Sequence, residues 1–199
     1  VSPAGVGLIS DGMMKAIWVG LVGLYGWQAW QIYLVNKDML KNGVNESQKY
    51  KFKQVAILNL CYFISFGTEL ALISILPVFF ATTFDLSPVL SGILVGCFAC
   101  MNLVARPAGG LFSDKIGRRK SLLILLTGMT VGMYLLSRIT SEWSVTFAMF
   151  TLLACAVFGQ AGSGAVFAMV PLIKRRLTGQ VAGMTGAFGN VGGVVFLTV

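Results

Sequence analysis

Residues 105–123 read ARPAGGLFSDKIGRRKSLL, and their charges bear directly on whether the chain is soluble or embedded in a membrane. Arg106 lies inside an apolar run, while Asp114 and a basic block follow where that run ends. An ionisable residue within a membrane span is costly and marks a functional site, whereas basic residues just beyond a span are typical of a loop. The stretch therefore indicates a membrane helix that ends near Asp114, with a functional charge inside it.

The composition supports a membrane protein. Of the 199 residues, 56% are hydrophobic and only 11% are charged, whereas a soluble domain has about 25% charged residues. A soluble fold of this length could not cover so much apolar surface. The apolar runs are continuous rather than alternating, which argues against membrane-spanning strands. We predict an all-α, polytopic membrane protein.

Six apolar runs predict six transmembrane helices, since a span needs about 20 residues. The runs cover residues 17–35, 55–81, 89–111, 122–136, 145–173 and 181–199. The loops after the first, third and fifth runs hold twelve of the fifteen Lys and Arg residues. This bias places those loops in the cytoplasm of a multi-pass protein of the plasma (inner) membrane.

Several function classes fit the sequence poorly. The net charge of +8 is spread over three loops, which topology explains better than nucleic-acid binding. The chain has no His, and the Cys97–Cys100 pair has no further ligand cluster nearby, so we expect no metal and no cofactor. No nucleophile and base are paired in a pattern typical of an enzyme, so we expect a non-enzymatic protein.

Two ionisable residues lie within the predicted spans, Glu69 and Arg106. Tyr62, Phe66 and Glu69 share one face of the second span by helical spacing. This face is either a pathway wall whose carboxylate titrates or pairs with Arg106, or a set of core aromatics beside a structural ion pair. Arg106 could extend to the nearby cytoplasmic end of its span. We favour a functional role, because a guanidinium stays charged and matches a planar oxyanion.

The last apolar run is unusually rich in glycine. Its sequence includes TGQVAGMTGAFGNVGG, in which one stripe holds Gly179, Gly183, Gly186, Asn190 and Gly193. Glycine this dense weakens an isolated helix, so close helix packing or substrate passage is needed to explain it. Asn190 offers amide donors to an anion or to a neighbouring helix.

The segment GGLFSDKIGRRK, residues 109–120, resembles the loop motif of the major facilitator superfamily. In that motif an Asp and basic residues form a charge cluster at the cytoplasmic ends of two helices. The resemblance implies that Asp114, Arg118 and Arg119 act as a conformational latch and take no part in catalysis.

Four further segments resemble the nitrate/nitrite porter family, closest to its cyanobacterial and algal type. They are CYFISFGTELA, ARPAGGLFSD, GQAGSGAVFAMVP and GQVAGMTGAFGNVGG. The resemblance implies twelve helices in two halves. Nitrate would lie midway between the halves, held by one Arg from each half and flanked by aromatic residues. It assigns substrate binding to Arg106, Tyr62, Phe66, Gly189 and Asn190. Glu69 receives no role from it, and we keep this residue as a candidate for ion coupling.

The expected organisation follows from the same resemblance. The chain is expected to be a fragment covering about helices 6–11 of 12. Residues 1–35 would hold the last helix of the N-terminal half with its preceding loop, residues 36–54 a cytoplasmic linker, and residues 55–199 most of the C-terminal half. The partner would be the N-terminal half of the same polypeptide.

The expected function is uptake of nitrate and/or nitrite by alternating access, coupled to protons. Anion uptake against an inside-negative potential needs a coupled cation, since each charge costs about 2.3 kcal/mol per 100 mV. Nitrate–nitrite exchange, another facilitator substrate, a channel and a membrane sensor remain as alternatives. The sequence leaves open the preference between nitrate and nitrite, the coupling ion and the oligomeric state.

Overall fold

The computed structural model describes residues 10–43 and 49–198, and every regular element in these two ranges is helical. The elements are α1 (Asp11–Asn42), α2 (Phe52–Phe84), α3 (Pro88–Cys100), α4 (Asn102–Ile116), α5 (Arg118–Leu136), α6 (Val145–Ile173), the 3-10 turn η2 (Arg175–Leu177) and α7 (Thr178–Thr198). The all-α class is confirmed. Five stretches are long and apolar enough to cross a membrane, namely Phe52–Phe84, Pro88–Ile116, Arg118–Leu136, Val145–Ile173 and Arg175–Thr198.

The first unit, residues 1–49, contains α1. Ser10 caps this helix by accepting a hydrogen bond from the Met13 N–H, and none of the helix residues is buried. A helix with apolar side chains all round is expected in lipid or between other helices. Its glycines, tryptophans and glutamines keep it outside the five most apolar stretches. α1 continues to Asn42, beyond the predicted span at residues 17–35.

The predicted divisions at residues 35 and 54 lie inside α1 and α2, respectively. α1 extends seven residues into the expected linker. α2 begins at Phe52, before the linker is expected to end at residue 54. Residues 1–9 of the first expected segment and residues 44–48 of the expected linker lie outside the described residues. Compact unit 2 begins at Tyr50.

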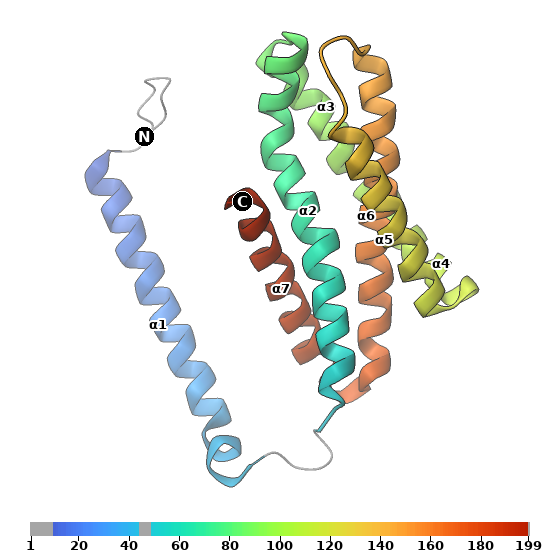
Figure 1. The fold of residues 1–199 in the computed structure, drawn as a ribbon. Coiled ribbons are helices and arrows are strands. Elements are labelled where there is room, and N and C mark those ends of the chain that lie inside the picture. Colours follow the sequence, from blue (N-terminus) through green and yellow to red (C-terminus); the bar gives the residue numbers. More distant parts are fainter. Residues whose placement is uncertain (1–9, 44–48, 199) are drawn as a thin grey trace. The chain divides into compact units, whose positions relative to one another are not determined.

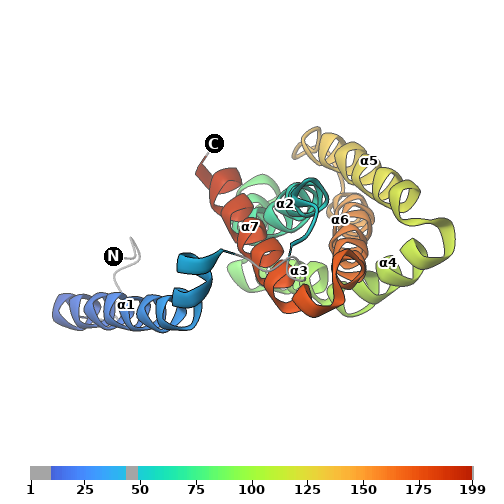
Figure 2. The same cartoon turned by 90° about the horizontal axis from the view of Figure 1, so that it is seen from below.

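The second unit is a helical bundle built around α2 and α6. α7 packs along α2, while α4 and α5 pack along α6, as the two views show (Figures 1 and 2). One buried apolar cluster surrounds Tyr62, Leu125 and Val166, and another surrounds Phe80 and Leu152. Many outward side chains are apolar and exposed, which suits a surface that faces lipid or further helices.

Glycines bring two helix pairs into backbone contact. A Cβ atom at Gly109 of α4 would overlap the carbonyl group of Ala161 on α6, and one at Gly164 of α6 would overlap the Arg106 carbonyl. Between α2 and α7, a Cβ at Gly192 would overlap the Phe63 carbonyl. Small residues at such crossings allow close approach. The α4–α6 contact thus fixes the backbone of Arg106.

The predicted glycine stripe on α7 serves this packing only in part. Gly193 meets the Leu70 side chain, whereas Gly179, Gly183 and Gly186 face open space in the described chain. Close packing therefore explains the C-terminal part of the stripe.

The predicted span at residues 89–111 is divided into α3 and α4 at Met101. Met101 keeps helical angles (φ −57°, ψ −23°), so the two helices are offset rather than reversed. Gln160 of α6 donates its Nε2–H to the Phe98 carbonyl at 2.9 Å. In a continuous helix this carbonyl accepts from the amide of Asn102. A side chain from another helix thus satisfies the backbone where the span is interrupted.

The turn between α4 and α5 is a single residue, Gly117. Its backbone has φ +99° and ψ 138°, a conformation that favours glycine. Arg118, Arg119 and Lys120 therefore form the first turn of α5. The fourth span thus begins at Arg118, before the predicted residue 122, and the predicted basic loop is largely helical.

Candidate functional site

The two ionisable residues predicted within the membrane form an ion pair. Arg106 Nη2 of α4 lies 3.1 Å from Glu69 Oε2 of α2. The Glu69 side chain is 5% exposed and the Arg106 side chain 34%. A buried carboxylate needs such a partner, because an isolated charge in an apolar setting is very costly. The pair therefore joins α2 to α4 and leaves the cation accessible from one side.

Asn102 completes this cluster. Its Nδ2–H donates to Glu69 Oε1, and its Oδ1 accepts from Arg106 Nε at 2.7 Å. Sequence reasoning missed Asn102, although it precedes Arg106 by four residues and so shares its helical face. The amide orients both charged groups at once.

The predicted aromatic residues lie beside this cluster. Tyr62 and Phe66 stack with ring centroids 4.9 Å apart, and Phe167 meets Tyr62 edge-on at 4.8 Å. The Arg106 Cζ lies 5.0 Å from the Phe66 ring centroid, within cation–π range. The structure thus brings together Tyr62, Phe66 and Arg106, three of the residues to which the resemblance assigns substrate binding.

Gly189 of α7 lies against the same two rings, because a Cβ there would meet Tyr62 and Phe66. The absence of a side chain at Gly189 leaves space for these two rings. Asn190, the neighbouring predicted residue, is exposed and has no hydrogen bond within the described residues. Gly189 therefore reaches the cluster through its packing, and Asn190 presents its amide on the surface of the bundle.

Arg106 retains hydrogen-bonding capacity. Its Nε donates to Asn102 and its Nη2 donates to Glu69. A guanidinium has five N–H donors, so several remain for another group. With its partly exposed edge and an aromatic ring nearby, the cluster can bind a small, planar anion.

The predicted latch residues lie at the α4–α5 turn. Arg118 Nη2 approaches Asp114 Oδ1 at 3.9 Å, and both side chains are at least half exposed. Such a surface pair contributes little stability by itself. Arg119 follows Arg118 in the first turn of α5, and both residues line a groove between helices.

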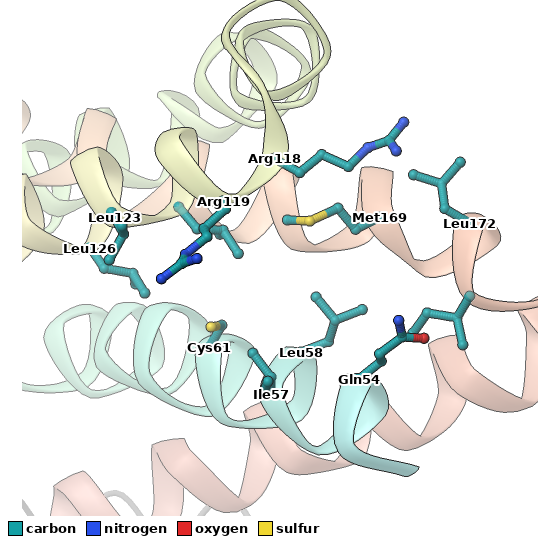
Figure 3. Close-up of a pocket in the computed structure, with 12 residues that line it drawn as sticks. Gln54, Ile57, Leu58, Cys61, Arg118, Arg119, Leu123, Leu126, Met169 and Leu172 are labelled. Carbon is teal, nitrogen blue, oxygen red and sulfur yellow. The ribbon is translucent and has the colours of Figure 1, made fainter. Parts of the chain in front are cut away.

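That groove lies between α2, α5 and α6 and has a volume of about 500 Å³. Leu58, Leu122 and Met169 are among its mostly apolar lining residues. The Arg119 side chain extends toward α2, whereas Arg118 extends away from it (Figure 3). None of the residues of the Arg106 cluster lines this groove, so its size does not identify the anion site.

Within the described ranges no group of three or more His, Cys, Asp or Glu residues could hold a metal ion. The four cysteines, including the Cys97–Cys100 pair, are free. The charged and hydrogen-bonding side chains of the site, Glu69, Asn102 and Arg106, come from α2 and α4.

Comparisons with known proteins point to transport. The chain is 48% identical over 184 residues to the "Nitrate/nitrite transporter NrtP" of Picosynechococcus sp., covering 91% of this chain and 34% of that protein. It is 42% identical over 189 residues to the protein of the same name from Nostoc punctiforme, covering 94% and 38%. The "Nitrite extrusion protein" of Bacillus subtilis is 33% identical over 146 residues, covering 72% and 36%.

The chain thus spans about a third of the length of these curated relatives. No solved structure gives a significant match. The names of the relatives are those of transport proteins, in agreement with the expectation of a non-enzymatic protein. The model of the family described as "Major Facilitator Superfamily" matches residues 58–199, which include Glu69, Asn102 and Arg106. The chain therefore belongs to the major facilitator superfamily.

Proposed function

We propose that this chain is part of a transporter for nitrate and/or nitrite, in which Arg106 binds the anion. The observation that carries the proposal is the intramembrane Arg106, held by Asn102 and Glu69 with donors still uncommitted. The relatives named as nitrate/nitrite transporters support this choice of substrate.

The chemistry of Arg106 favours a planar oxyanion. Two N–H groups on one edge of a guanidinium can donate in parallel to two oxygens of such an anion. The Phe66 ring lies within cation–π range of the guanidinium. Phe66 and the stacked Tyr62 thus form an aromatic wall beside the ion.

Glu69 competes with the anion for Arg106. In the structure the carboxylate neutralises the guanidinium. An anion that arrives beside this pair is repelled by the negative charge of the carboxylate. Protonation of Glu69 removes that repulsion. The summed charge of Arg106, Glu69 and the anion is then zero. The geometry therefore supports a coupling role for Glu69, with one proton bound per anion.

Transport would follow alternating access, in which two helical halves rock around a site near the middle of the membrane. The N-terminal half of the same polypeptide would supply the opposite wall and a second arginine. The basic helix ends, including Arg118, would lie in the cytoplasm. There the Asp114–Arg118 pair would serve as part of the latch, since a weak exposed pair can break and reform during rocking.

Nitrate–nitrite exchange is the second candidate. The Bacillus subtilis relative is named a nitrite extrusion protein, which favours nitrite as a transported ion. In an exchanger, the second arginine would balance the anion and Glu69 could remain ionised. The two modes differ in whether protons move with the anion.

The experiment is uptake of isotopically labelled nitrate by the full-length protein in proteoliposomes. A proton gradient, acidic outside, should drive uptake by the wild type. Glu69→Gln should lose this stimulation, because the amide cannot take up a proton. Glu142→Gln, which alters an exposed carboxylate, is the matched control and should keep it.

Two results would contradict the proposal. Wild-type protein that takes up neither nitrate nor nitrite would exclude the substrate. Full proton stimulation in Glu69→Gln would remove Glu69 from coupling. Uptake that requires nitrite inside the proteoliposomes and does not depend on the proton gradient would establish exchange in place of symport.

A further inference from the structure

Glu69 also lines a small cavity between α2, α3, α5 and α6. The cavity has a volume of about 10 Å³, and its polar lining residues are Ser65, Thr68, Glu69 and Gln160. The rest of its wall includes Phe98, Met129 and Cys155. This volume is close to the smallest that admits one water molecule.

Gln160 contributes an unused acceptor to this cavity. The residue is 1% exposed, and its Oε1 has no hydrogen-bond partner within the described part of the chain. Its Nε2 donates to the Phe98 carbonyl. This contact fixes the orientation of the amide, because exchanging the two atoms would place two acceptors against each other. The orphaned atom is therefore an oxygen.

Ser65 contributes a hydroxyl to the same cavity. It is fully buried and accepts a hydrogen bond from Ser163 Oγ at 3.1 Å, so its own O–H remains available as a donor. Buried polar atoms without a protein partner are usually satisfied by ordered water, which needs two to four polar partners. The Gln160 oxygen, the Ser65 hydroxyl and the Glu69 carboxyl provide that number.

We propose that this cavity is a water site, in which one water bridges Gln160 Oε1 and Glu69 and delivers the coupling proton. The inference rests on the proposed function, which requires Glu69 to become protonated when an anion occupies Arg106. A protonated carboxyl is a hydrogen-bond donor and needs an acceptor. The Gln160 oxygen supplies that acceptor through the water.

The proton transfer is balanced within the site. The cavity water takes up a proton from the aqueous phase as hydronium, one hydronium O–H bond breaks as an O–H bond forms on Glu69, and a neutral water remains. The charged or titratable groups near Glu69 are Arg106 from α4, Tyr62 from α2 and Cys155 from α6, while the cavity residues of α3 and α5 are not titratable. Arg106 stays charged, so Glu69 is the group that takes the proton when the anion binds.

The test is infrared difference spectroscopy of the full-length protein in lipid, recorded on addition of nitrate or on acidification without nitrate. The wild type should show a carboxylic-acid C=O band that is absent in Glu69→Gln. It should also show a water O–H band that shifts in heavy-oxygen water. In Gln160→Met the acid band should move to higher wavenumber and the water band should vanish.

Ser65→Ala is a second variant that keeps the Gln160–Phe98 contact, and its water band should shift or weaken. A wild-type acid band that is unchanged in both Gln160→Met and Ser65→Ala would overturn the inference. Nitrate binding measured in the same samples separates the two proposals. Nitrate binding with acid and water bands that do not change in the cavity variants contradicts the water site alone. Acid-induced bands that change in these variants, without nitrate binding, contradict the proposed function alone.

Discussion

Replacing Arg106 by lysine is expected to lower nitrate uptake by the full-length protein about tenfold to a hundredfold. A hydrogen bond to a charged group contributes about 1.5–3 kcal/mol, and 1.4 kcal/mol corresponds to a factor of ten. Lysine keeps the positive charge but has no planar fork. Its ammonium group cannot donate hydrogen bonds to Asn102, Glu69 and an anion in the directions that the guanidinium N–H groups provide.

The measurement is initial uptake in proteoliposomes at matched protein content. Arg176→Lys is the matched control, because Arg176 is exposed on η2, away from the cluster. The control should retain wild-type uptake. Wild-type uptake in Arg106→Lys as well would show that a guanidinium is not required, and would contradict the anion-binding role.

Gly164→Ala is expected to lower both stability and uptake. The new methyl group would overlap the backbone carbonyl of Arg106, so α4 and α6 must separate. Overpacking of this kind costs about 1–3 kcal/mol. A displacement of about 1 Å at a positioned group can reduce activity by about a hundredfold. The apparent melting temperature and the uptake rate of the full-length protein should therefore fall together.

Gly110→Ala is the matched control on the same helix contact. A Cβ at Gly110 would lie 3.7 Å from the Ala168 Cβ, an ordinary packing distance. This variant should melt and transport like the wild type, while Gly109→Ala should resemble Gly164→Ala because it overlaps Ala161. Equal behaviour of all three variants would contradict the close α4–α6 contact.

Much of the fold could be predicted from continuous apolar runs and their flanking charges. The run at residues 145–173 coincides with α6, because Ser144 caps its start and basic residues follow its end. The break at Met101 had no local signal. It coincides with the hydrogen bond from Gln160, which lies 62 residues beyond Phe98 in the sequence.

The charged part of the candidate site was predictable, because burying a charge in an apolar span costs free energy. Arg106 and Glu69 could be paired from the sequence because two charges within apolar spans need compensation. Helical spacing also placed Tyr62 and Phe66 on the face of Glu69. The position of Asn190 could not be derived in this way, since the rotation of α7 is set by Gly189 and Gly192 against α2. The orphaned Gln160 oxygen likewise depends on packing between helices.

In the proposed mechanism, an anion and Glu69 compete for Arg106. The most direct test of this competition is calorimetric titration of nitrate into the full-length wild type and into Glu69→Gln at neutral pH. Removing the competing charge should make nitrate bind more tightly, by at least about tenfold given the strength of a charged hydrogen bond. Equal or weaker binding by Glu69→Gln would contradict competition between nitrate and Glu69 for Arg106.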